Sequence, residues 1–76
     1  MIYKNAQTRI EEFIYSFAQE FGKIENEHLI VKNFLSNRDI AKLTSTSRQI
    51  VNAVMNRMRQ ENRIDYDARY IRVIRE

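Results

Sequence analysis

The residues best suited to chemistry in this 76-residue chain form a polar group, Ser47-Arg48-Gln49, with Asn52 one helical turn later. An arginine guanidinium offers a planar pair of donors that matches the two acceptors of guanine, and a Gln or Asn amide can both donate to and accept from adenine. A bidentate pair of this kind discriminates between bases by about 1–3 kcal/mol. We therefore predict that Arg48, Gln49 and Asn52 contact the edges of DNA bases.

Side chains around this group are suited to the sugar-phosphate backbone instead. A hydroxyl at the start of a helix lies beside backbone N–H groups that have no intrahelical acceptor, and such a helix end attracts phosphate. Arginines further along the chain can add contacts that position a protein on a duplex without reading its sequence. The predicted phosphate contacts are Ser36, Asn37, Thr46, Ser47, Arg57 and Arg69.

A helix over 37–44 is predicted to hold the first of these residues. Ser36 and Asp39 have the spacing of a capping box, in which the serine side chain accepts from a freed amide and the carboxylate reaches back to the backbone of the cap. Apolar residues follow at helical intervals, and we expect Ile40, Ala41 and Leu43 to face inward.

A second, recognition helix is predicted over 47–61. Thr46 and Gln49 repeat the capping-box spacing and predict a second box at its start. Two helices that begin so close together must turn sharply, as in a helix-turn-helix, whose second helix enters the major groove of DNA. The residues expected to form the inward face of this helix are Val51, Val54, Met55 and Met58.

An amphipathic helix is predicted over 6–21, between an N-cap at Asn5 and Gly22 after its end. The two faces of this helix differ in polarity. The inward face is expected to supply most of the aromatic core, through Ile10, Phe13, Ile14, Phe17 and Phe21. The opposite face is expected to be solvated and carries Glu11, Glu12, Gln19 and Glu20.

The spacing of apolar residues changes from helical to alternating after residue 62, which predicts a β-hairpin, or wing, over 63–74. Its tip lacks glycine, and Asp67 is expected to supply a left-handed residue there. The apolar run at 28–31 predicts a short strand that pairs with the wing. Residues 1–76 are therefore expected to form a single domain that is mainly α with a small β wing (α+β). The expected fold of this domain is a winged helix-turn-helix of three helices plus a C-terminal β-hairpin.

Charge and composition agree with a nucleic-acid partner and narrow the alternatives. Residues 38–76 contain nine Lys and Arg and five acidic residues, a formal charge of +4, whereas residues 1–37 have a formal charge of −1. The chain has no cysteine and one histidine, so we predict no metal, no cofactor and no enzymatic activity. No apolar run is long enough to span a bilayer, and a cytoplasmic location is the expectation.

The string NRDIAKLTSTSRQIVNAVMNRMRQENRIDYDARYIRVI resembles the DNA-binding domain of the cyclic-AMP receptor protein/fumarate-nitrate regulator (Crp/Fnr) superfamily. In that superfamily a DIA segment, a TSR tripeptide, a recognition helix, an N-x-I exit and a small wing occur in this order. The preceding RIEEFIYSFAQEFG is similar to the first helix of the same domain. The resemblance covers nearly the whole chain and implies the output domain of a bacterial-type transcription regulator.

By this resemblance Arg48 matches the leading base-reading arginine and Gln49 the position of a glutamate, while Ser36 and Ser47 match positions that meet phosphate. Three positions depart from the pattern. Ala53 stands where a second arginine is usual, Ile50 where a threonine is common, and Ser45 where the turn glycine occurs. We expect a half-site that differs from the best-known ones. Ile50 is expected to pack against the neighbouring helix. The alternative is that it contacts the methyl group of a thymine.

The resemblance also implies partners. The expected partner is double-stranded DNA, as a palindromic operator when the protein is dimeric, and RNA polymerase is a further candidate. Dimerisation is expected through an N-terminal sensor domain that this chain lacks, so the segment alone is expected to be a monomer or weak dimer, either cut from a longer regulator or a complete small protein. A different interpretation also stays open, that of a winged-helix protein-protein interaction module without sequence-specific DNA reading.

Overall fold

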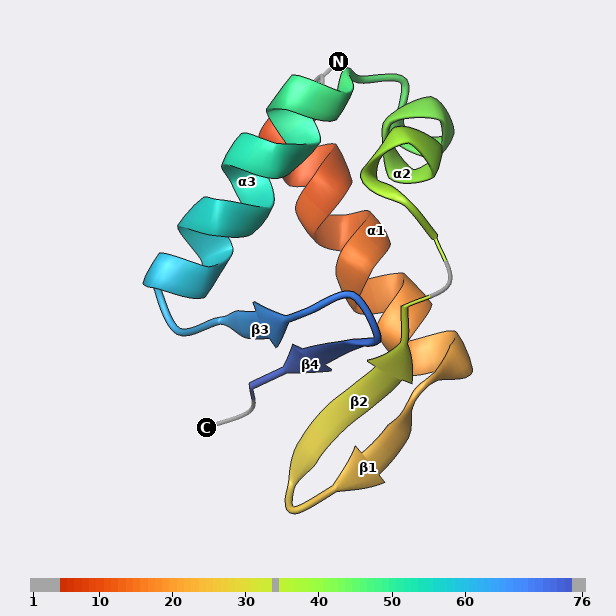
Figure 1. Cartoon of the computed structure of the whole chain (residues 1–76), viewed down its shortest axis with the longest axis vertical. Helices are drawn as coiled ribbons and strands as arrows, with labels where there is room; N and C mark the ends of the chain where they lie inside the picture. The colour runs from red at the N-terminus through yellow and green to blue at the C-terminus, as the bar shows by residue number, and fades with distance from the viewer. Residues whose placement is uncertain (1–4, 34, 75–76) are drawn as a thin grey trace.

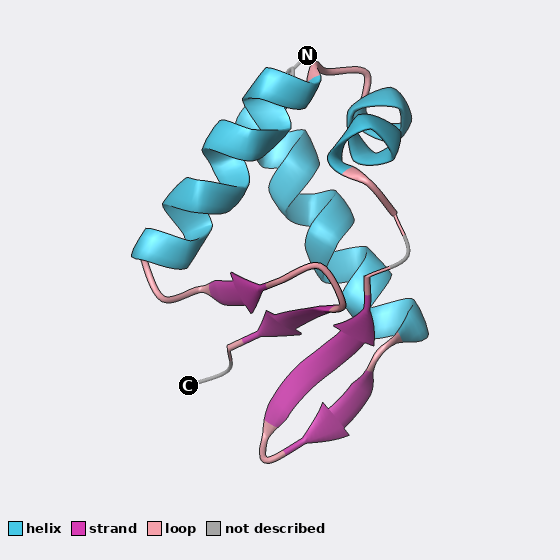
Figure 2. Ribbon diagram, viewed as in Figure 1, coloured by secondary structure: helices cyan, strands magenta, loops and turns pink. Residues whose placement is uncertain are grey.

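A computed structural model describes residues 5–33 and 35–74 of the chain. Three helices pack against a four-stranded antiparallel sheet whose strand order is β1-β2-β4-β3. Figures 1 and 2 show the helices gathered at one end of the molecule and the sheet at the other. The elements are α1 (Ala6–Phe21), β1 (Lys23–Glu25), β2 (His28–Lys32), α2 (Asn37–Thr44), α3 (Arg48–Gln60), β3 (Ile64–Tyr66) and β4 (Tyr70–Val73). The predicted α+β winged helix-turn-helix is confirmed.

Helix α1 begins and ends for identifiable reasons. Asn5 caps it, as predicted, by accepting a hydrogen bond of 2.8 Å from the backbone N–H of Thr8. At its other end Gly22 has an ordinary φ of −89°, so glycine is needed there for space and not for backbone conformation. A Cβ atom at Gly22 would lie 2.3 Å from the carbonyl oxygen of Ala18 and 2.9 Å from that of Ile30. The placement of Phe21 in the core was wrong, since its side chain is 57% exposed.

The apolar strand predicted over 28–31 occupies 28–32 and pairs with the wing, with Leu29 opposite Val73 and Val31 opposite Ile71. Strand β1 was not predicted. It forms a hairpin with β2 through Asn26 and Glu27, whose φ angles of 51° and 67° are those of a type I′ turn. The sheet therefore has one strand more than the three that were predicted.

The tip of the wing, between β3 and β4, turns by a different mechanism from the one expected. Asp67 does not adopt a positive φ, so its assignment as a left-handed residue was wrong. Its carboxylate instead accepts hydrogen bonds from the backbone N–H groups of Arg69 (2.7 Å) and Tyr70 (2.9 Å). These bonds hold the pKa of Asp67 below its usual range and fix the turn through the side chain.

A single core lies between the three helices and one face of the sheet. The helices contribute their apolar stripes, and the strands contribute alternate residues, as the period of 2 requires. Leu43, which was expected to face inward from α2, is 62% exposed, and that prediction was wrong. The buried residues are Ile10, Ile14, Phe17, Ala18, Val31, Ile40, Ala41, Val51, Val54, Met55, Met58, Ile64, Ile71 and Val73.

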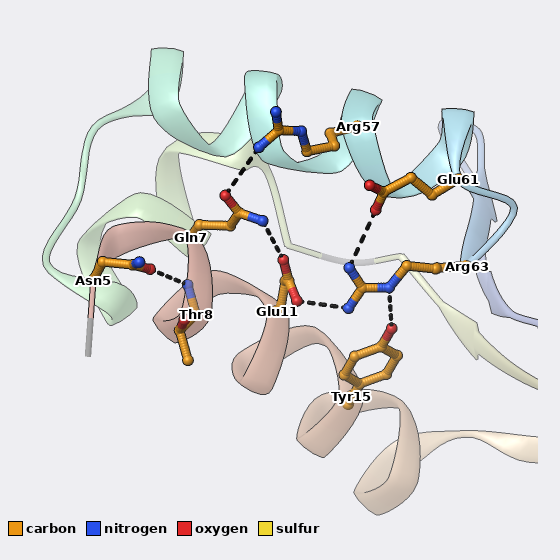
Figure 3. Close-up of polar contacts among 8 residues, drawn as sticks. All are labelled: Asn5, Gln7, Thr8, Glu11, Tyr15, Arg57, Glu61 and Arg63. Carbon is orange, nitrogen blue, oxygen red and sulfur yellow. Dashed lines mark hydrogen bonds and ion pairs between the residues drawn. The ribbon is translucent and has the colours of Figure 1, made fainter.

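A polar network joins α1 to the end of α3 and the start of the wing (Figure 3). The Arg63 guanidinium lies 2.6 Å from the Glu11 carboxylate and donates to the Tyr15 hydroxyl at 3.1 Å. The Glu11 side chain was expected to be solvated but is only 17% exposed. The hydrogen bond from Arg63 holds the pKa of Glu11 below its usual range, and Glu11 raises the pKa of Arg63 in return.

In the described part of the chain, no helix has the combination of length and apolar character required to cross a lipid bilayer.

Candidate nucleic-acid interface

The connection between α2 and α3 is a tight three-residue turn built on Ser45. This residue adopts the left-handed conformation (φ 56°, ψ 46°) that favours glycine. The N–H of Ser45 approaches the Lys42 carbonyl oxygen at 3.4 Å, and the N–H of Thr46 donates to the Ala41 carbonyl at 2.8 Å. This is the hydrogen-bond pattern of a Schellman motif, which satisfies the last carbonyls of α2 and redirects the chain into α3.

The caps of the two helices differ from each other. Ser36 and Asp39 form the capping box predicted for α2, and the backbone N–H of Ser36 lowers the pKa of Asp39. The second box, Thr46 with Gln49, was wrong. Ser47 caps α3 instead, accepting from the Ile50 N–H at 3.2 Å, while the Thr46 hydroxyl lies 2.9 Å from that of Thr44. The Schellman turn explains the shift, because it places Thr46 in the turn.

Arg9 of α1 also holds this turn in place, a role that the sequence did not suggest. Its guanidinium donates to the carbonyl oxygens of Thr44 at 3.0 Å and of Ser45 at 3.3 Å. These are carbonyls at the C-terminal end of α2, where a cation is favoured by the helix dipole. The start of α3 is thereby positioned from three sides, by its own cap, by α2 and by α1.

Two of the three predicted base-reading residues, Arg48 and Gln49, lie in the first turn of α3 with exposed side chains. Within the described residues, no hydrogen bond or ion pair holds either side chain. Asn52 is also exposed, but its amide oxygen accepts a hydrogen bond from the side chain of Asn37 on α2. The NH₂ group of Asn52 has no partner among the described residues and remains available as a donor.

The outermost line of α3 lies opposite its buried stripe. At 100° per residue, Gln49, Ala53 and Asn56 fall on this line, with Arg48 and Asn52 on one flank and Arg57 on the other. Asn56 was not predicted as a site residue, yet it is exposed and its side-chain oxygen accepts from the Tyr66 hydroxyl at 3.1 Å. Ile50, which was expected to pack against the neighbouring helix, is 40% exposed and lines a hollow together with Gln7 of α1.

The predicted phosphate contacts fall into three groups. Ser47 and Arg69 have exposed polar groups, at the start of α3 and at the tip of the wing. The side chains of Ser36 and Thr46 are engaged locally, since the Ser36 hydroxyl donates to Asp39 at 3.0 Å and the Thr46 hydroxyl meets Thr44. The remaining two bind other helices, Asn37 through Asn52 and Arg57 through Gln7 of α1 at 3.2 Å.

The residues described form no cluster of three or more His, Cys, Asp or Glu side chains that could hold a metal ion. The exposed groups at the start of α3 are hydrogen-bond donors and acceptors on a basic half of the chain. Such an arrangement can bind and discriminate the edges of bases, but it offers no activated nucleophile or acid-base pair.

No protein-family model matches this chain, and no curated protein matches it significantly in sequence. Several solved structures share its fold. Reduced CprK without ligand matches with a TM-score of 0.85 at 22% identity, over 96% of this chain and 35% of CprK. Oxidized CprK in complex with o-chlorophenolacetic acid matches with a TM-score of 0.82 at 25% identity, over 91% of this chain and 29% of that one.

A mutant of CooA from Carboxydothermus hydrogenoformans matches with a TM-score of 0.82 at 22% identity, over 92% of this chain and 33% of CooA. The chain thus spans about a third of the length of the solved structures it matches. CprK and CooA are Crp/Fnr family regulators. The resemblance of this chain to the Crp/Fnr family, inferred from its sequence, is therefore confirmed in its fold.

Proposed function

We propose that this chain is the DNA-binding domain of a Crp/Fnr-like transcription regulator, and that it reads double-stranded DNA with the start of α3 in the major groove. The observation that carries the proposal is the state of Arg48 and Gln49. Both are exposed in the first turn of α3, and neither has a partner among the described residues. A recognition helix needs its first-turn side chains in this state, because they approach the base edges first.

The chemistry of the exposed side chains of α3 suggests what is read. Arg48 is suited to the O6 and N7 acceptors of guanine, and the Gln49 amide is suited to adenine. Ala53 offers a methyl group that can contact thymine. Because its oxygen is held by Asn37, Asn52 contributes a donor, which suits an acceptor such as purine N7.

Ser47 and Arg69 are the strongest of the proposed phosphate contacts. Ser47 lies at the N-terminus of α3, where backbone N–H groups and the helix dipole favour an anion. Arg69 lies at the wing tip, where the side chain of Asp67 fixes the backbone on which it stands. The Ser47 hydroxyl accepts from the Ile50 N–H, but its O–H can still donate to a phosphate. The other four are weaker candidates because the polar groups of their side chains already bind other side chains of the domain.

The proposal extends to partners. Within a complete regulator, two copies of the domain would bind a palindromic operator through dimerisation outside this chain, and RNA polymerase is a further partner. The proposal includes a cytoplasmic location and no enzymatic activity, cofactor or metal. DNA affinity is expected to fall steeply with salt, because phosphate contacts release counterions.

The rival function, a protein-protein interaction module, has one observation in its favour. Leu43 of α2 is 62% exposed and lines a hollow with Arg9, Glu12, Phe13, Ser16, Thr44 and Ser45. This hollow lies between α1 and the end of α2, and no residue of α3 lines it. It therefore does not explain why Arg48 and Gln49 are exposed and polar.

Selection from a randomised duplex library at low salt tests the proposal. The domain is expected to retain a short consensus that contains a guanine. Arg48→Ala is expected to lose that guanine and about 10- to 100-fold of specific affinity, equivalent to about 1–3 kcal/mol. Arg59→Ala is the matched control on the same helix, because the Arg59 guanidinium is held over the Tyr66 ring at 3.8 Å.

Each alternative result has a clear meaning. Equal losses from Arg48→Ala on specific and random duplexes would remove Arg48 from the base-reading role. Retention of DNA without any consensus would leave only electrostatic attraction. No retention at all would favour the interaction module.

A further inference from the structure

Strand β1 forms an uncovered edge of the sheet. It pairs with β2 on one side, and it is one of the two outer strands in the order β1-β2-β4-β3 (Figure 2). All three of its residues, Lys23, Ile24 and Glu25, are exposed. An outer strand of this kind presents backbone N–H and C=O groups that can pair with another strand.

The hairpin geometry identifies which backbone groups are available. In a two-residue type I′ turn, the residues that flank the turn form a hydrogen-bonded pair, which here is Glu25 with His28. Hydrogen-bonded and non-hydrogen-bonded pairs alternate along an antiparallel ladder. Ile24, opposite Leu29, is therefore in a non-hydrogen-bonded pair, and its N–H and C=O point toward the uncovered side.

The sequence of β1 is complementary to itself when two copies run antiparallel. If Ile24 lies opposite Ile24 of a second copy, the two residues can exchange both backbone hydrogen bonds. Lys23 then lies opposite Glu25 of the other copy, and Glu25 opposite its Lys23. Opposite charges directly across antiparallel strands stabilise the pair, and like charges destabilise it. A shift by two residues would place like charges opposite each other, so the charges also select this register.

Apolar surface beside the strand adds to the contact. The side chains of Ile24 and Phe21 are 69% and 57% exposed. Ile24 and Leu29 share one face of the sheet, where they line a hollow together with Tyr15, Gln19, Gly22 and Val73. Pairing across the twofold axis would bring the two Ile24 side chains together on this face and withdraw them from water.

We propose that two copies of this chain associate through β1, by antiparallel pairing of Lys23-Ile24-Glu25 with the same strand of the second copy. The strand lies at the opposite end of the molecule from the start of α3, so the pairing leaves Arg48 and Gln49 uncovered (Figure 1). The contact is isologous, as closed two-fold dimers require. It is small, and the association is accordingly weak, with a Kd on the order of 1 mM.

Titration of the full chain to about 1 mM, followed by sedimentation equilibrium and by amide chemical shifts, tests this pairing. The wild-type chain is expected to dimerise, with its largest shift changes at the amide of Ile24 and its neighbours and none in α3. Lys23→Glu or Glu25→Lys alone places like charges opposite each other in both pairs and is expected to weaken the dimer by about tenfold or more. Lys42→Glu, the same charge change on exposed α2, is the control and is expected to leave the dimer unchanged.

The mixture of the two single variants is the decisive measurement. Lys23→Glu and Glu25→Lys chains together regain two opposite-charge pairs, so an equimolar mixture is expected to form a heterodimer of wild-type strength. The double variant K23E/E25K is expected to dimerise with itself for the same reason. A wild-type chain that stays monomeric over the whole range would overturn the proposal. So would a mixture that associates no better than its components, or a dimer that is insensitive to both single reversals.

Discussion

Helix α3 carries arginines near both of its ends, and the two ends use them differently. Arg48, in the first turn, is exposed and has no partner among the described residues. At the other end the Arg57 guanidinium donates to Gln7, and the Arg59 guanidinium lies over the Tyr66 ring and donates to its carbonyl oxygen. Arg63, just beyond the helix, is held by Glu11, Tyr15 and Glu61. The guanidinium at the start of α3 is available to a ligand, whereas the guanidinium groups near its end stabilise the domain.

This difference shows that the number of basic residues overstates the positive surface available to DNA. The Glu11 carboxylate largely compensates the charge of Arg63, so this arginine adds little to the attraction of a phosphate backbone. Arg48 keeps its full charge and all its donors. We therefore expect substitutions near the end of α3 to change the stability of the domain, and substitutions at its start to change DNA affinity.

The largest loss of stability is expected from Gly22→Ala, at the end of α1. The added Cβ would lie 2.3 Å and 2.9 Å from two carbonyl oxygens, which must move apart. We expect a loss of about 2–3 kcal/mol in the free energy of unfolding, measured by urea titration. The folded fraction should keep its DNA affinity. A loss below about 0.5 kcal/mol, the level of an ordinary surface substitution, would show that the end of α1 can shift without cost.

Arg63→Ala and Arg48→Ala are the direct test of the comparison. Arg63→Ala removes the partner of a carboxylate that is 17% exposed and should lower the free energy of unfolding by about 1–2 kcal/mol. Arg48→Ala should change it by less than about 0.5 kcal/mol. In DNA titrations of the folded proteins, Arg48→Ala should cause the larger loss of affinity and Arg63→Ala the smaller one. Similar effects of both variants in both measurements would remove the distinction between the two ends.

Part of this arrangement was predictable from the sequence, because local patterns encode it. The bounds of α1 and α2 and the capping box of Ser36 follow from apolar spacing and cap residues. Strand β1 was missed because its three residues contain one apolar side chain, Ile24, which is too few to reveal an alternating pattern, although Asn26 suits a type I′ turn. Adjacent hydroxyls at Thr46 and Ser47 left the N-cap of α3 ambiguous, and only the turn at Ser45 decides between them.

The polar network was not predictable from local patterns. Arg63 and Glu11 are 52 residues apart in the sequence, and Arg57 and Gln7 are 50 apart. No helical or strand period relates such positions, so Glu11 was assigned to a solvated face and Arg57 to a phosphate. Their contacts depend on how α1 crosses α3, and the packing of the whole core sets this crossing.

A smaller effect, dependent on pH, is expected from Glu11→Gln. The hydrogen bond from Arg63 holds the pKa of Glu11 below its ordinary value of 4.5. The carboxylate therefore contributes its full stabilisation above this value and loses it as the pH falls through the lower pKa of the folded state. We expect the variant to be about 1 kcal/mol less stable than the wild type at neutral pH.

The difference between these two proteins should shrink as the pH falls below about 4.5, in thermal or urea unfolding across the acid range. Glu20→Gln, on the exposed face of the same helix, is the control, and it should show no comparable change. A difference between wild type and Glu11→Gln that stays constant through the acid range would mean that the charge of Glu11 does not contribute to stability.

The smallest expected effect is a gain, from Ser45→Gly at the turn that positions the start of α3. A non-glycine residue with φ of 56° costs about 1–2 kcal/mol. Glycine removes this cost but increases the conformational freedom of the unfolded chain. The net result should be about 0.5–1 kcal/mol of added stability. The control is Ser16→Gly, at an exposed position of α1, which should lower stability by about 0.5 kcal/mol.

The DNA affinity of Ser45→Gly should stay within about twofold of the wild type if the Schellman bonds and Arg9 already fix the turn. A larger loss of affinity would show that the strained serine itself positions Arg48 for base reading.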